Sequence, residues 1–287
     1  MRKHVVGSQL TCIAVACALA GSAGAGGAAI PRPGKSFVVF NATQYANEPA
    51  TGLAGFAKVR LYSKSLVSHP GRGATSDRGY DPAAARQSGA LQAKEGPMLA
   101  VLDLEAWHFD ASDLHKYLGT IQAFKLTCGG CTVGYYGYMP FANWLLYGYF
   151  AHKNAADLQQ WLSFQRQSDA IGVASDAFMP SLYTWGTNIT AWQRAARKAV
   201  AYARALNPNK RIYAFIWPQF DTHRAPTDLT FIPGAIWRKE LETLYPITDG
   251  VIIWSNDKGP SGRRIKFSTR MPWYQVTETF MKQRDLR

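Results

Sequence analysis

The feature that most constrains the fold of this chain is a repeated alternation between short apolar runs and segments with helical spacing. The runs are almost continuously apolar, which is typical of strands buried on both faces of a parallel sheet. They cover residues 37–41, 58–62, 98–105, 132–138, 177–183, 211–217 and 250–254. We therefore expect about seven parallel strands joined by helices.

The helical segments are best marked in two places. Residues 190–206 place alanines and Trp192 on one face and basic side chains on the other, as in an amphipathic helix. A second helix, with apolar residues spaced from Leu114, follows Asp110 and Ser112, which suit an N-cap.

This alternation predicts an α/β fold of TIM-like (β/α)-barrel type. The repeats contain neither of the glycine-rich phosphate-binding turns, GxGxxG or GxxxxGK[ST], that a nucleotide-binding open sheet would carry. A length of 287 residues suits one large domain better than two small ones, so residues 37–287 are expected to form a single barrel. No cofactor is predicted.

The N-terminus has the pattern of an export signal. A basic start, an apolar stretch and a small-residue exit predict a signal peptide over residues 1–25, followed by a Gly/Pro/Ala-rich linker over 26–36. The apolar stretch is shorter than the roughly 20 residues that a membrane span needs, so no stable span is expected. Lipid attachment at Cys17 is a weaker alternative, because the usual leucine three residues earlier is missing. The protein is predicted to be secreted or periplasmic.

The net charge limits the partners of the exported protein. Cleavage after residue 25 would remove Arg2 and Lys3 and lower the net charge from +13 to +11. This excess of positive charge favours an anionic partner such as an acidic glycan, and no nucleic-acid-binding motif is present. A monomer is expected.

Two cysteines, Cys128 and Cys131, remain after the signal in the sequence Cys-Gly-Gly-Cys. No second cysteine pair or histidine cluster supplies the other ligands of a zinc site, so no metal is predicted and a disulfide is favoured. A Cys-x-x-Cys at a helix start is also typical of thioredoxin-like redox proteins. Here the pair is expected in the turn between a helix and a strand, which favours a structural disulfide.

The candidate chemistry starts at Asp103 and Glu105, at the end of the third predicted strand. Residues two apart on a strand point to the same side, with Cα atoms roughly 6.5–7 Å apart, and barrel enzymes work at the carboxyl ends of their strands. Two carboxyls in a sheltered site cannot both ionise cheaply, so one keeps its proton, as a general acid must. A buried acidic pair held by Arg or backbone donors, or a Mg²⁺ or Ca²⁺ site, fits the same residues.

Aromatic residues at neighbouring strand ends favour a sugar site. Their flat faces can stack on the C–H surface of a pyranose ring, and their O–H and N–H groups can orient its hydroxyls. One such residue alone is expected in the core, but several beside two carboxyls favour glycan binding. The predicted substrate-binding residues are Tyr136, Tyr183, Trp254, Trp107, Tyr138 and Trp217.

Four segments share their order with one known family. They are Leu-Asp-Leu-Glu-Ala-Trp (102–107), Gly-Tyr-Tyr-Gly-Tyr (134–138), Met-Pro-Ser-Leu-Tyr (179–183) and Gly-Val-Ile-Ile-Trp-Ser (250–255). These resemble the D-W-E-E-W, G-Y/F-Y-G/A-F/Y, Y-P-S-I-Y and G-V/I-V/I-L/I-W segments of the hyaluronidases, the barrel glycosidases of animals and venoms. The likeness spans about residues 37–256.

The resemblance implies a distorted seven-stranded barrel and a retaining, substrate-assisted hydrolysis of a polysaccharide that contains a 2-acetamido sugar. By this resemblance Glu105 would be the general acid and base. Asp103 would orient the acetamido group, whose oxygen attacks the anomeric carbon. Tyr136, Tyr183 and Trp254 would wall the pocket around that group.

The chain departs from the family at two positions. The arginine that follows the family's tryptophan is His108 here, and its second glutamate is Ala106. The family's interdomain cysteines and cysteine-rich module are absent as well. Peptidoglycan, a capsule or a chitin-like polymer therefore fits as well as hyaluronan. A non-catalytic glycan-binding barrel is the competing function, and a Cys-x-x-Cys oxidoreductase is a third.

Overall fold

The computed structural model describes residues 37–49, 52–68, 79–96, 98–105, 107, 112–222 and 227–286. The predicted signal (1–25) and linker (26–36) lie outside these residues, as does Asp110 of the predicted helix start. None of the helices in the described ranges has the length and apolar character needed to cross a membrane.

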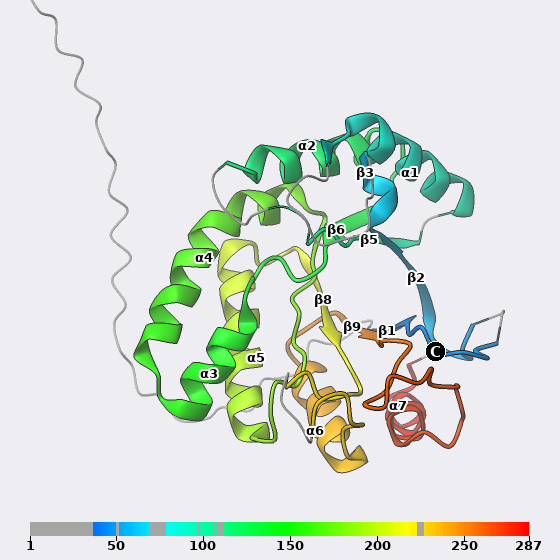
Figure 1. Cartoon of the computed structure of the whole chain (residues 1–287), viewed down its shortest axis with the longest axis vertical. Helices are drawn as coiled ribbons and strands as arrows, with labels where there is room; N and C mark the ends of the chain where they lie inside the picture. Colours follow the sequence, from blue (N-terminus) through cyan, green and yellow to red (C-terminus); the bar gives the residue numbers. More distant parts are fainter. Residues whose placement is uncertain are drawn as a thin grey trace, which may run out of the picture. The chain divides into compact units, whose positions relative to one another are not determined.

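Seven parallel strands form a nearly closed barrel, as predicted (Figure 1). They are β1 (Val38–Ala42), β2 (Ala57–Tyr62), β5 (Leu99–Leu102), β6 (Thr132–Tyr135), β7 (Ala177–Phe178), β8 (Arg211–Ile216) and β9 (Gly250–Trp254). Their order in the sheet is β6-β5-β2-β1-β9-β8-β7, so each strand lies beside its neighbours in the chain and β9 returns to β1. This order is what repeated strand-helix units produce when a parallel sheet curls round on itself.

The barrel closes at one seam, between β6 and β7. There the ladder is reduced to an isolated bridge between Tyr136 and Met179. The amide of Asp176 donates to the carbonyl of Val133 at 2.7 Å, and the amide of Gly137 donates to the carbonyl of Met179 at 2.9 Å. We call this narrow contact the β6–β7 seam.

Three strands are shorter than predicted at their carboxyl ends. The apolar runs 98–105, 132–138 and 177–183 continue past the last paired residue of β5, β6 and β7. The first residue after β5, Asp103, still donates its amide to Tyr62, and the chain then leaves the sheet. The ends of these runs line the mouth of the barrel with a mixture of aromatic and polar side chains and do not continue the strands.

Helices surround the strands, and they lie outside the sheet in Figure 1. They are α1 (Pro82–Glu95), α2 (Leu114–Lys125), α3 (Asn143–His152), α4 (Ala155–Ala174), α5 (Ile189–Leu206), α6 (Gly234–Leu244) and α7 (Pro272–Gln283). The helix predicted near Leu114 is confirmed as α2, but Asp113 occupies its N-cap, so the predicted cap at Ser112 is wrong by one residue. A short 3-10 helix (Lys64–Leu66) and a hairpin of β3 (Val67–Ser68) and β4 (Gly79–Tyr80) precede α1 and were not predicted.

The amphipathic helix predicted over 190–206 is α5. Its buried face consists of Trp192, Val200 and alanines, which belong to the main apolar cluster, and the small side chains let α3 pack closely against the helix. The Trp192 indole N–H donates to the carbonyls of Leu182 at 3.0 Å and Tyr183 at 3.2 Å. The helix therefore fixes the segment that follows β7.

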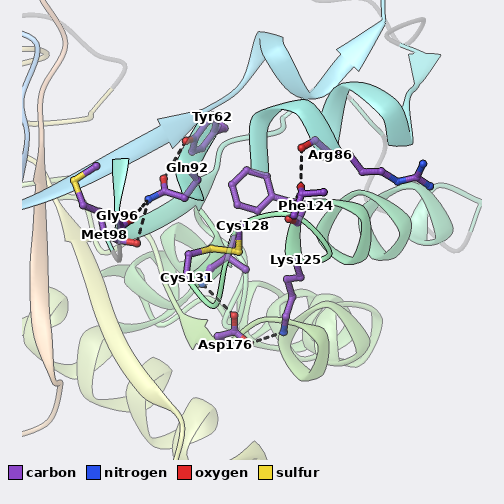
Figure 2. Close-up of a disulfide and its surroundings, with 12 residues drawn as sticks. Tyr62, Arg86, Gln92, Gly96, Met98, Phe124, Lys125, Cys128, Cys131 and Asp176 are labelled. Carbon is purple, nitrogen blue, oxygen red and sulfur yellow. Dashed lines mark hydrogen bonds and ion pairs between the residues drawn. A yellow bond between two sulfur atoms is a disulfide. The ribbon is translucent and has the colours of Figure 1, made fainter. Parts of the chain in front are cut away.

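The disulfide between Cys128 and Cys131 lies in the turn from α2 to β6, where a structural disulfide was expected. Figure 2 shows it beside the Phe124 ring, and both cysteines belong to the same apolar cluster as Phe124. Nearby, Lys125 forms an ion pair with Asp176, which precedes β7. The disulfide thus lies at the amino-terminal end of β6, opposite the strand ends that carry the predicted site.

Candidate active site

The carboxyl ends of the strands bring five of the predicted site residues together. Asp103 and Glu105 follow β5, Tyr136 follows β6, Tyr183 lies after β7, and Trp254 ends β9. All five line one cavity of about 90 Å³, which Leu61 and Phe215 complete. Residues that are distant in the sequence meet here because the strands are parallel and end at the same edge.

The aromatic walls of this cavity are packed ring on ring. Tyr183 and Trp254 stack with centroids 5.8 Å apart and planes 19° apart, and Tyr136 lies 6.0 Å from Tyr183. Trp217 lies behind this wall, 5% exposed, with its ring edge-on to both Tyr183 and Trp254. Its indole N–H donates to Gln219 at 3.0 Å. In this position Trp217 supports the wall.

A larger cleft of about 540 Å³ adjoins the carboxyls. Besides Glu105 it is lined by aromatic, small and hydroxyl side chains and by Asp221: Trp107, Tyr136, Gly137, Tyr138, Phe141, Ala142, Trp144, Ser181, Tyr183, Trp185, Asp221 and Thr222. Its size and mostly apolar lining are those of a site for a small organic ligand or part of a polymer.

Trp107 and Tyr138 lie at the rim of this cleft but are mostly buried, at 4% and 6% exposed. The Tyr138 hydroxyl donates to that of Tyr117 at 2.8 Å, and the Tyr117 hydroxyl donates to the Trp107 carbonyl at 3.0 Å. Little of either side chain is open to the cleft, and the two hydrogen bonds tie Trp107 and Tyr138 to Tyr117 of α2.

The two carboxyls do not titrate at their ordinary values. Burial, helped by the negative charge of Glu105, raises the pKa of Asp103 from 3.8 to about 6. Burial also raises the pKa of Glu105, and the negative charge of Asp221 makes a smaller contribution in the same direction. Both carboxyls therefore retain a proton more readily than free carboxyls do.

The described residues contain no candidate metal-binding cluster. Within the described ranges, no three side chains of the ligand types His, Cys, Asp and Glu come together.

Asp221 was not predicted as a site residue. It follows the end of β8, and its amide donates to the carbonyl of Thr184 at 3.0 Å. A bridge between Thr184 and Phe220 strengthens the same link. The sequence did offer one signal, because Asp221 is a polar residue shortly after the end of a predicted strand. It was missed because it lies beyond the apolar run 211–217 that marked β8.

Glu240, on α6, was also missed. Its side chain is fully buried, and one oxygen, Oε1, accepts a hydrogen bond from the Thr184 hydroxyl at 2.7 Å. Its other oxygen, Oε2, has no hydrogen-bond partner among the described residues. Thr184 lies between Tyr183 and Trp185, so this buried carboxyl supports a segment with an aromatic residue of the cleft on each side.

Glu240 should make the stability of the protein depend on pH. Burial raises its pKa from 4.5 to about 8, against the opposing effect of the Thr184 hydrogen bond. Between pH 5 and 8 the unfolded chain ionises this group while the folded protein keeps it protonated, so the free energy of unfolding should fall by up to about 4 kcal/mol. Glu240→Gln should lose this part of the pH dependence in urea unfolding at pH 5 and pH 8.

The exposed Glu242 of the same helix provides the control for this measurement. Glu242→Gln should keep the pH dependence of the parent protein. An unchanged difference between pH 5 and pH 8 in Glu240→Gln would show that the buried carboxyl is not responsible.

The fold is similar to that of bee venom hyaluronidase. Its monoclinic crystal structure matches with a TM-score of 0.53 and 13% identity, over 87% of this chain and 97% of that chain. The structure of bee venom hyaluronidase in complex with a hyaluronic acid tetramer matches with the same score and identity, over 87% and 96%. No protein-family model and no curated protein sequence matches the chain. At this level of identity the likeness concerns the fold.

Proposed function

We propose that the protein is an exported glycoside hydrolase that cleaves a polysaccharide containing N-acetylhexosamine. The observation that carries the proposal is the meeting of Asp103 and Glu105 with Tyr136, Tyr183 and Trp254 in one cavity at the carboxyl end of the barrel. The raised pKa of both carboxyls and the hyaluronidase-like fold support it. Export rests on the predicted signal over residues 1–25.

In the proposed reaction Glu105 acts first as the acid. Its proton passes to the glycosidic oxygen as the bond from that oxygen to the anomeric carbon breaks. The acetamido oxygen of the same sugar attacks the anomeric carbon from the opposite face and forms a cyclic oxazolinium. Glu105, now a carboxylate, takes a proton from the water that opens this ring, so the anomeric configuration is retained.

Asp103 has a separate part in this reaction. Positive charge develops on the acetamido nitrogen as its oxygen attacks, and a carboxylate that accepts the N–H hydrogen bond stabilises that charge. Tyr183 and Trp254, stacked against each other, would enclose the acetamido group and exclude water from it.

The experiment is incubation of the purified protein with N-acetylated glycans, read by mass spectrometry. The panel contains hyaluronan, chitin oligosaccharides and peptidoglycan fragments. Products cut next to an N-acetylhexosamine are expected from at least one of them. Binding without any product would favour the competing function, a glycan-binding barrel without catalysis.

A further inference from the structure

Trp144 is the most exposed aromatic side chain on the wall of the large cleft. It belongs to the first turn of α3 and keeps 46% of its surface open. Most tryptophan side chains in folded proteins are largely buried, so a half-exposed one inside a concave site is unusual. It shares the cleft with Glu105, but it does not line the small cavity that holds Asp103 and Trp254.

The residues that pack against Trp144 are fixed by ring contacts and by hydrogen bonds from a buried side chain. Its ring lies edge-on to Phe141 with centroids 5.6 Å apart, and Phe141 stacks on Tyr138 at 5.1 Å. The fully buried Gln165 of α4 accepts a hydrogen bond from the Phe141 amide and donates one to its carbonyl, each at 2.9 Å. This pair of bonds fixes the backbone just before α3.

A second buried amide ties the same segment to the other side of the cleft. Asn143 is 1% exposed and donates to the carbonyls of Pro140 at 2.9 Å and Ser181 at 3.1 Å. Its oxygen accepts from the Trp161 indole at 3.3 Å. The backbone on both sides of Trp144 is therefore positioned before any ligand arrives, which lowers the entropy cost of binding at this place.

We propose that Trp144, supported by Phe141, is a separate sugar-binding subsite, which stacks on a pyranose ring of the glycan chain away from the ring cut at Glu105. This proposal rests on the proposed function for the identity of the chain. A pyranose ring suits the subsite because its apolar C–H face can cover the indole, while its hydroxyls face a cleft whose lining includes the hydroxyl residues Ser181 and Thr222.

The test compares long and short ligands in a variant whose turnover is expected to be too slow to consume them during the measurement. In the Glu105→Gln background, the affinity for N-acetylglucosamine hexamer and dimer is measured by calorimetry, and hyaluronan hexasaccharide and tetrasaccharide are run in parallel. Adding Trp144→Ala should reduce the ratio of hexamer to short-ligand affinity roughly 3- to 10-fold, as expected for the loss of one stacking contact. Trp144→Phe keeps an aromatic face and should restore most of that ratio.

Leu126→Ala provides the control. Leu126 is 75% exposed and follows α2 at the opposite end of the barrel, so its removal should leave the ratio unchanged. Thermal unfolding of each variant establishes that the protein is folded. An unchanged ratio in folded Trp144→Ala, or no binding of either hexamer to the Glu105→Gln protein, would overturn the subsite.

The subsite and the proposed function fail in different ways. If the intact protein cuts none of the glycans but the hexamer still binds through Trp144, the hydrolase proposal is wrong and the subsite stands. If hydrolysis depends on Glu105 but Trp144→Ala leaves the ratio of hexamer to short-ligand affinity unchanged, the subsite is wrong and the hydrolase proposal stands.

Discussion

Replacing Glu105 by Gln is expected to lower the turnover number about 10²–10⁴-fold on whichever glycan the protein cuts. Glutamine preserves the shape and hydrogen-bonding reach of the side chain but cannot pass a proton to the glycosidic oxygen. Affinity for the glycan should remain within a few-fold, because the aromatic walls are unchanged. Initial rates at saturating substrate, together with calorimetric binding, separate the two quantities.

The control for this experiment is Glu242→Gln, which changes an exposed carboxyl on α6 and should leave turnover unaltered. Turnover by Glu105→Gln equal to that of the unmodified protein would remove Glu105 from the role of general acid. Loss of glycan binding together with turnover would instead point to a structural part for this residue.

Replacing Asp103 by Asn should slow hydrolysis by roughly 10²–10³-fold, because the amide cannot stabilise positive charge on the acetamido nitrogen. The pH profile gives a second readout. Below about pH 6 Asp103 becomes protonated, so the kcat/KM of the unmodified protein should fall on that side. Asp103→Asn, whose residual activity no longer needs this ionisation, should lose that acid limb.

The substrate itself supplies the control for this second prediction. A thiazoline analogue of N-acetylglucosamine, which mimics the cyclic intermediate, should inhibit. A glycan without the 2-acetamido group should bind and stay intact. A covalent glycosyl adduct on Asp103, trapped by a 2-fluoro sugar and seen by mass spectrometry, would replace substrate assistance with an enzyme nucleophile.

The strands and the carboxyl pair were predictable because local patterns determine them. A run of apolar residues reports burial on both faces, and the position of Asp103 and Glu105 at the end of such a run places them at the carboxyl end of the barrel. Because the parallel strands of a barrel end at the same edge, the fold alone predicts that Tyr136 and Trp254 lie near this carboxyl pair. The ends of the runs were less predictable, because aromatic and other buried side chains continue past the last paired residue of each strand into the mouth of the barrel.

Glu240 and Trp144 show what the sequence does not reveal. A glutamate in an amphipathic helix is expected to be exposed to solvent. Glu240 is buried instead, where Thr184, 56 residues earlier in the chain, donates a hydrogen bond to it. Trp144 lies in a strongly apolar stretch that suggests a core helix, whereas the positions of Phe141 and Gln165 leave its ring at the cleft surface. Both placements arise from contacts between distant segments.

If the proposed function is right, a glycan bound in the small cavity would also reinforce the β6–β7 seam. Tyr136 lies on one side of this seam and Tyr183 on the other, and both line the same cavity. A sugar in that cavity would contact both sides of the line where the backbone ladder is thinnest and where local opening is least costly. Occupancy should therefore slow deuterium uptake at the amides of Gly137 and Asp176, which cross that line, so that the ligand strengthens the weakest join of a ring that the polypeptide nearly closes by itself.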